Sequence, residues 1–132
     1  MRSDMSLGYR RNVKLSFEEA ESRLRAALQE QGFGVLTEID VQATLKKKLN
    51  ADIRSYKILG ACHAPSALKA LSIVPEIGLL LPCNVTVSLN DDDTVRVAAV
   101  DAEAMLGVVK EPELVPVAAE VNKRLQAAID AV

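Results

Sequence analysis

The sequence has few aromatic residues, no tryptophan and no excess of positive charge. Aromatics make up 3% of its 132 residues, and 16 Lys and Arg against 18 Asp and Glu give a net charge of −2. Nucleic-acid binding needs positive surface to neutralise phosphates and, for single strands, aromatic rings on which bases stack. The composition therefore argues against nucleic acid as the main partner.

Cysteines and long apolar runs are also scarce. The two cysteines, Cys62 and Cys83, are too few for a disulfide framework and are not in a CxxC spacing, so we expect reduced thiols. The longest apolar stretch, residues 77–83, is interrupted by Pro82 and is far shorter than the roughly 20 residues of a membrane span. Residues 7–14 alternate polar and apolar side chains, unlike the apolar core of a signal peptide. These absences predict a cytoplasmic protein without membrane association.

The chain does contain enough apolar residues for a core, arranged in periodic segments. Hydrophobic residues make up 49% of the sequence, and we expect residues 1–132 to form a single domain. Apolar residues at period two predict strands, and those at helical spacing predict helices. The strands are predicted at residues 7–14, 33–39, 55–62, 78–89 and 94–100, and the helices at 16–31, 40–49, 65–74 and from Pro112 or Pro116 to near the C-terminus. This order, β-α-β-α-β-α-β-β-α, predicts an α+β fold with one sheet of about five strands and helices packed on a face.

Local signals support several of these boundaries. Ser16 and Glu19 have the spacing of a capping box, in which each side chain satisfies an unpaired backbone donor, and Gly32 supplies a left-handed stop. Asp40 and Asp101 are predicted to cap the segments that follow them. Residues 90–93, Asn-Asp-Asp-Asp, favour a tight turn between two arms of a hairpin. In residues 78–89 the apolar side chains share one parity: Leu79, Leu81, Cys83, Val85, Val87 and Leu89.

The residues with the most chemical potential are two thiols and the single histidine. Cys62 and His63 close one predicted strand, and Cys83 lies within another. If these strands are neighbours, the thiols are a candidate redox pair, or Cys62, His63 and Cys83 are three candidate ligands for Zn²⁺ or another transition metal. Adjacent residues of a strand point to opposite faces, so Cys62 and His63 share a metal only if the strand ends between them.

Other roles for these residues stay open. Cys83 has the parity of Leu81 and Val85, which is typical of a small core residue, and His63 suits a surface position near a helix start. Because His63 is the only histidine, any mechanism that needs two imidazoles in one subunit is excluded. A Cys83 and His63 nucleophile pair would need direct contact and a stabilised thiolate.

Several strings of the sequence, taken together, resemble a known family. They are residues 32–41 (GFGVLTEIDV), 44–46 (TLK), 58–62 (ILGAC) and 78–85 (GLLLPCNV), followed by Asp101 and Met105. In this order they resemble domain-of-unknown-function family 302 over nearly the whole chain. After Cys62 the family commonly has Asn-Pro, where this chain has His63 and Ala64.

The resemblance implies a compact α+β domain of prokaryotes, often described as a dimer, with no established activity, substrate or cofactor. Its motifs direct attention to the same region as the residue types do. We therefore expect a homodimeric module that binds a small molecule or a transition metal near the two cysteines. The candidate site residues are Cys62, His63, Pro82, Cys83, Asn84 and Asp101, with Cys62, His63 and Cys83 as the metal set. Two alternatives stay open: a thiol-dependent enzyme or redox protein that uses Cys62 and Cys83, and a purely structural interaction domain.

Overall fold

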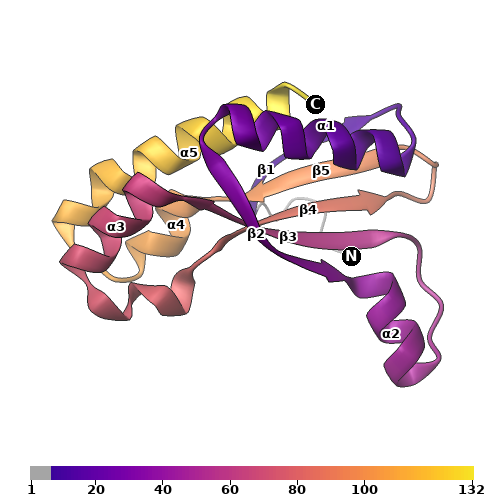
Figure 1. Ribbon diagram of the computed structural model, residues 1–132, viewed down its shortest axis with the longest axis horizontal. Coiled ribbons are helices and arrows are strands. Elements are labelled where there is room, and N and C mark those ends of the chain that lie inside the picture. The colour runs from indigo at the N-terminus through magenta and orange to yellow at the C-terminus, as the bar shows by residue number, and fades with distance from the viewer. Residues whose placement is uncertain (1–6) are drawn as a thin grey trace.

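A sheet with the strand order β1-β5-β4-β3-β2, antiparallel at every neighbouring pair, organises the fold (Figure 1). The computed structural model describes residues 7–132. The strands are β1 (Gly8–Val13), β2 (Phe33–Asp40), β3 (Tyr56–His63), β4 (Cys83–Leu89) and β5 (Val95–Val100). The helices are α1 (Phe17–Glu30), α2 (Val41–Leu49), α3 (Ala64–Ile73), α4 (Ala102–Gly107) and α5 (Val115–Asp130), with short 3₁₀ helices η1 (Pro75–Leu80) and η2 (Pro112–Leu114). The predicted α+β class and element order are confirmed.

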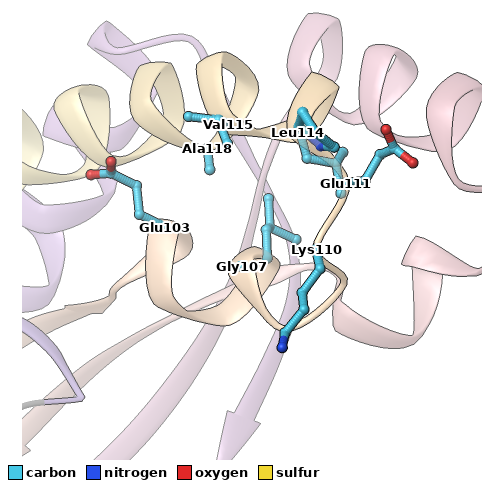
Figure 2. Close-up of a pocket in the computed structure, with 9 residues that line it drawn as sticks. Glu103, Gly107, Lys110, Glu111, Leu114, Val115 and Ala118 are labelled. Carbon is cyan, nitrogen blue, oxygen red and sulfur yellow. The ribbon is translucent and has the colours of Figure 1, made fainter.

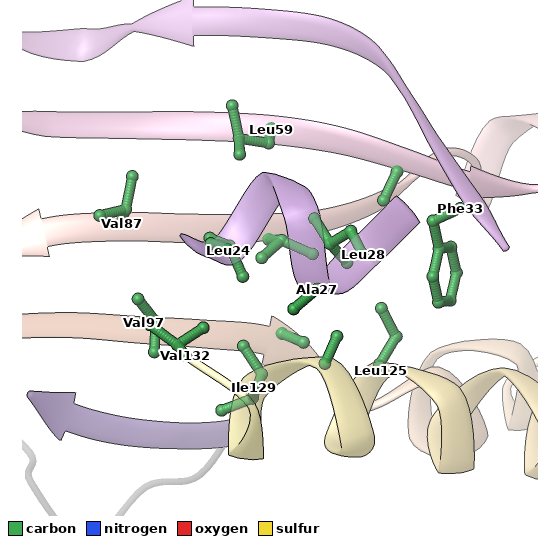
Figure 3. Close-up of a cluster of buried hydrophobic side chains, with 14 of the residues drawn as sticks. Leu24, Ala27, Leu28, Phe33, Leu59, Val87, Val97, Leu125, Ile129 and Val132 are labelled. Carbon is green, nitrogen blue, oxygen red and sulfur yellow. The ribbon is translucent and has the colours of Figure 1, made fainter. Parts of the chain in front are cut away.

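Helices α1 and α5 cover one face of the sheet and build the main core with it. Figure 3 shows Leu24 and Leu28 of α1 and Ile129 of α5 among the apolar side chains that meet the strands. The apolar side chains of α5 that meet the main core are all buried: Val121, Leu125, Ala128 and Ile129. No side chain caps the start of this helix, so its packing against the core holds it in place.

The opposite side of the sheet, which we call the uncovered face, has a different composition. Along β5, Val95 and Val97 are fully buried under the helices, whereas Arg96 between them is half-buried on the other side. Among residues 7–132 no helix lies across the middle of this face (Figure 1). The same strands therefore present an apolar surface to the core and a largely polar one away from it.

Helix α2 extends from the end of the β2 and β3 pair, away from the main core (Figure 1). The Asp40 side chain caps it as predicted, accepting from the Ala43 N–H at 2.9 Å, and the left-handed Asn50 (φ 52°) ends it. None of its residues is buried. Its attachment therefore depends on its two flanking strands.

The structure corrects two strand predictions. The strand predicted at residues 78–89 begins only at Cys83, because Pro82 has no N–H to donate to the ladder and residues 75–80 turn into η1, leaving Leu79 exposed. In β2 a bulge between Val35 and Thr37 shifts the register by one residue. Phe33 and Ile39 are spaced at period two within the predicted strand, but beyond the bulge Ile39 is 49% exposed, opposite Ile58.

The predicted helix boundaries need smaller corrections. Ser16 caps α1 by accepting from the Glu19 N–H at 3.1 Å, but the Glu19 carboxylate pairs with Arg23. Gly32 follows α1 with φ 85°, as its left-handed stop requires. Pro65 is the second residue of α3 rather than the first, and Pro112 begins η2 while Pro116 lies in the first turn of α5.

A second, smaller core joins α3, η1, α4 and the start of α5 at one end of the sheet. It contains Ala70, Ile77, Leu106, Leu114, Val117 and Ala118. Within residues 7–132, no helix has the length and apolar character that crossing a membrane requires.

Candidate functional site

The two cores meet at a cavity that we call the strand-end cavity. It has a volume of about 320 Å³ and is lined by residues of β2, β3, α3, η1, α4 and α5 and by the start of β4. Four of the residues named from the sequence line it, namely Cys62, His63, Pro82 and Cys83. The other lining residues, Ser66 apart, are apolar.

Both cysteines line this cavity, at the ends of neighbouring strands. Ala61 of β3 pairs directly with Cys83 of β4, Cys62 follows Ala61, and both thiols are free. Burial raises the pKa of the Cys83 thiol to about 11, and the nearby Cys62 thiol adds to the rise. Cys83 is therefore protonated at neutral pH and lacks the thiolate that nucleophilic chemistry needs.

His63 is the last residue of β3 and is fixed by contacts on several sides. Its Nδ1 lies 2.6 Å from the Ser66 Oγ, and its ring is tilted against Phe33 with the centroids 5.8 Å apart. A Cβ built on Gly32 would lie 3.2 Å from the His63 ring, so the absence of a side chain there leaves room for it. Burial, and then the charge of Arg124, lower the pKa of His63, so the imidazole is neutral at neutral pH.

Ser66 was not predicted as a site residue, although the sequence carries a weak signal for it. It lies three residues after His63 at the start of α3, the spacing at which side chains around a helix N-terminus meet. Its side chain is buried, and its hydroxyl is bonded to the imidazole. Ser66 and His63 together place a small polar group in a mostly apolar cavity.

The expected metal set is not assembled. No group of three His, Cys, Asp or Glu side chains within the described residues 7–132 is placed to hold a metal ion. The physical reason is that β3 continues through His63, so Cys62 and His63 extend from opposite faces of one strand. The hypothesis of a metal bound by Cys62, His63 and Cys83 therefore receives no support from the described residues.

Asn84 and Asp101 lie away from the strand-end cavity. Asn84 is the neighbour of Cys83 in β4, so strand alternation places it on the uncovered face, where it is exposed. Asp101 caps α4 by accepting from the Ala104 N–H at 3.0 Å and also accepts from the Asn122 amide at 2.9 Å. The bond from Asn122, followed by that from the Ala104 N–H, lowers the pKa of Asp101. These bonds account for Asp101 as a structural residue of the α4 and α5 pair.

A larger cavity of about 450 Å³ lies between α4, the loop after it and the start of α5. Figure 2 shows the charged ends of Glu103 and Lys110 directed away from it. Its walls include the apolar Leu106 and Leu114, and it contains no cysteine or histidine. Leu106 lines both cavities. We place the candidate site in the strand-end cavity because its apolar walls surround the bonded His63 and Ser66 pair and four of the residues named from the sequence line it.

Comparison with known proteins agrees with this fold. Residues 9–132 match the family model described as "Domain of unknown function DUF302". Among solved structures the chain is similar to the "Crystal structure of uncharacterized conserved protein DUF302 from Bacillus stearothermophilus", with 28% sequence identity and a TM-score of 0.89. That match covers 96% of this chain and 98% of the other. No curated protein matches the chain.

Proposed function

The chain belongs to the DUF302 family, whose domains have no known function, and we propose that it is a module that binds a small, mainly apolar organic molecule in the strand-end cavity. One observation carries the proposal. Four residues named from the sequence, Cys62, His63, Pro82 and Cys83, line one cavity of about 320 Å³ between the two cores.

The size and lining of the cavity support this class of ligand. Sites for small molecules typically occupy about 300 to 1,000 Å³, with apolar walls and a few polar groups that set orientation. Here the apolar walls surround the bonded His63 and Ser66 pair. With His63 neutral, the site carries no formal charge of its own, so an uncharged ligand is favoured over an ion.

The alternative of a thiol enzyme receives less support. A reactive cysteine needs a thiolate, which a neighbouring positive charge or a helix N-terminus stabilises. Cys83 is instead buried among core residues, and its pKa is raised to about 11. A binding role asks only that the thiols contribute soft, weakly polar surface.

We also propose that the module is a homodimer, as the family resemblance implies. Several exposed leucines support this proposal: Leu36, Leu68, Leu71 and Leu79. Leu36 and Leu71 line the strand-end cavity, so a second copy that covers them would also close its mouth. A purely structural interaction domain would use the same surface without a bound molecule, and the experiment below separates the two.

Native mass spectrometry of gently purified, reduced protein tests the binding proposal. A denatured spectrum of the same sample reports any covalent change of the thiols. The matched variants are Ala67→Leu, which fills the cavity from α3, and Ala64→Leu, which adds the same volume at an exposed position of that helix. We expect a stoichiometric non-covalent mass on the wild type and on Ala64→Leu, and its loss from Ala67→Leu.

A titration with 2-naphthol, a neutral two-ring probe, covers the case in which the natural ligand is lost during purification. Binding by the wild type and Ala64→Leu but not by Ala67→Leu supports the proposal. The absence of both a bound mass and probe binding, or equal behaviour of the two variants, overturns it. The same native spectra report the oligomeric state and so test the homodimer.

A further inference from the structure

A second groove, of about 320 Å³, lies on the uncovered face and is unrelated to the strand-end cavity. Its polar lining consists of Arg10, Tyr56, Asn84, Thr86, Ser88 and Arg96. Among residues 7–132, its lining contains the two arginines Arg10 and Arg96 and no aspartate or glutamate.

The sheet register sets these side chains in rows. Arg96 of β5 is paired with Asn12 of β1 on one side and with Ser88 of β4 on the other, and Ser88 is paired with Tyr56 of β3. The next row along the strands joins Arg10, Ala98 and Thr86. Directly paired residues of antiparallel strands point to the same face, so the hydroxyls of Ser88 and Tyr56 lie on the side of Arg96.

Arg96 of this groove has a buried donor atom without a partner among the described residues. Its Nε is buried and has no hydrogen-bond partner within the part of the chain that the structure describes. Five other arginines donate to carboxylate or carbonyl oxygens: Arg11, Arg23, Arg25, Arg54 and Arg124. A buried N–H of a charged group that lacks an acceptor is costly, so a position like this calls for an acceptor from outside the described chain.

We propose that the uncovered face is a binding site for a small organic carboxylate, with the Arg96 guanidinium as its charged contact. The guanidinium presents a planar set of donors that matches the two oxygens of a carboxylate. Ser88, Thr86 and Tyr56 supply hydroxyl donors beside it, and Asn84 an amide. Ala98 and Val100 give apolar surface for the carbon skeleton. This site gives Asn84 a role that the strand-end cavity does not.

Benzoate and its neutral analogue benzamide are the probes for this site. We expect the wild type to bind benzoate at low salt, as followed by isothermal titration calorimetry, and to bind benzamide at least about tenfold more weakly, because a charged hydrogen bond is lost. Arg96→Gln should lose benzoate binding by a similar factor. Arg96→Lys keeps the positive charge but lacks the planar pair of donors, so its affinity for benzoate should lie between those of the wild type and Arg96→Gln.

The control is Arg23→Gln, which removes an exposed arginine of α1 on the other side of the sheet and should leave binding unchanged. Circular dichroism melts show whether each variant is folded. If Arg96→Gln does not fold, Ser88→Ala is the site variant, and it should also weaken benzoate binding. Equal binding of benzoate and benzamide, or equal binding by Arg96→Gln and Arg23→Gln, overturns the proposal. So does tighter binding of inorganic phosphate than of benzoate. Light scattering gives the last outcome: if Arg96→Gln dissociates a dimer and benzoate does not bind, the acceptor belongs to a second copy and the proposal fails.

Discussion

The covered and uncovered faces of the sheet are made by the same five strands, but one face is packed under helices and the other is open. On β4, Val85 and Val87 are fully buried beneath the helices, while Thr86 and Ser88 between them line an open groove. Burial of the first set removes apolar surface from water and stabilises the fold. The second set contributes little to that stability, so its side chains are available for recognition. Neighbouring residues of one strand can therefore have different roles, one in stabilising the core and the next in contacting a ligand.

The largest effect on stability is expected from two neighbouring residues of β3 that lie on opposite faces of the sheet. Leu59 is fully buried on the covered face, and Ile58 is half-buried on the uncovered face. Leu59→Ala should lower the free energy of unfolding by about 2 to 5 kcal/mol, because it removes packed methyl groups and leaves a cavity. Ile58→Ala should cost under about 1.5 kcal/mol, since less of its side chain is packed. Urea denaturation measures both, and equal losses would mean that the uncovered face is itself covered in solution.

An intermediate effect is expected where the uncovered face is tightly packed. A Cβ on Gly60 would lie 2.1 Å from the Thr37 Oγ1 and 2.7 Å from the Pro82 Cγ. Gly60→Ala should therefore lower the free energy of unfolding by about 1 to 3 kcal/mol through overpacking. Gly34→Ala is the matched control, because its Cβ would meet only the Leu36 Cδ2 at 3.8 Å. Similar thermal stabilities of the two variants would contradict the prediction.

The smallest effect concerns the charged border between α1 and the covered face. Burial opposes ionisation of Glu21, but the hydrogen bonds from Lys57 and Arg25 outweigh it and lower the pKa of Glu21 below 4.5. The bond to Glu21 is the main cause that raises the pKa of Lys57 above 10.5, against a smaller opposing effect of its burial. The carboxylate contribution is present above pH 4.5 and is lost as pH falls through the folded pKa, while the lysine contribution is lost as pH rises above 10.5.

Glu21→Gln should therefore lower the free energy of unfolding by roughly 1 kcal/mol at neutral pH, the scale of a partly exposed ion pair. The difference from the wild type should shrink as pH falls below the pKa of Glu21. Urea denaturation at neutral and acid pH measures it, with Glu18→Gln at an exposed position of α1 as the control. A difference that does not depend on pH would show that Glu21 acts through packing instead of charge.

Local patterns were enough to predict most of the fold. The caps at Ser16, Asp40 and Asp101 act within three residues of themselves, so spacing alone identified them. The errors at Leu79 and Ile39 arose where a turn and a bulge interrupted the alternation that strand prediction assumes. A bulge depends on the partner strand, which a single sequence does not specify.

The candidate sites were predicted less completely, for the same reason. Spacing left open whether Cys62 and Cys83 lie near each other, and it grouped them with Asn84, which lines the groove on the uncovered face instead of the strand-end cavity. Ser66 and Arg96 became visible only through contacts that they make or lack in three dimensions. An unused hydrogen-bond donor has no signature in sequence spacing.

Helix α2, which buries none of its residues, has a consequence for how the molecule opens. Releasing it exposes little additional apolar surface, so its opening requires much less free energy than unfolding of the sheet. Its backbone amides should exchange with deuterium long before those of β4 and β5, and a protease should cut the chain there first. The two fragments would stay associated through the β2 and β3 ladder. The segment is therefore the natural place to insert a tag or a second domain without disturbing either face.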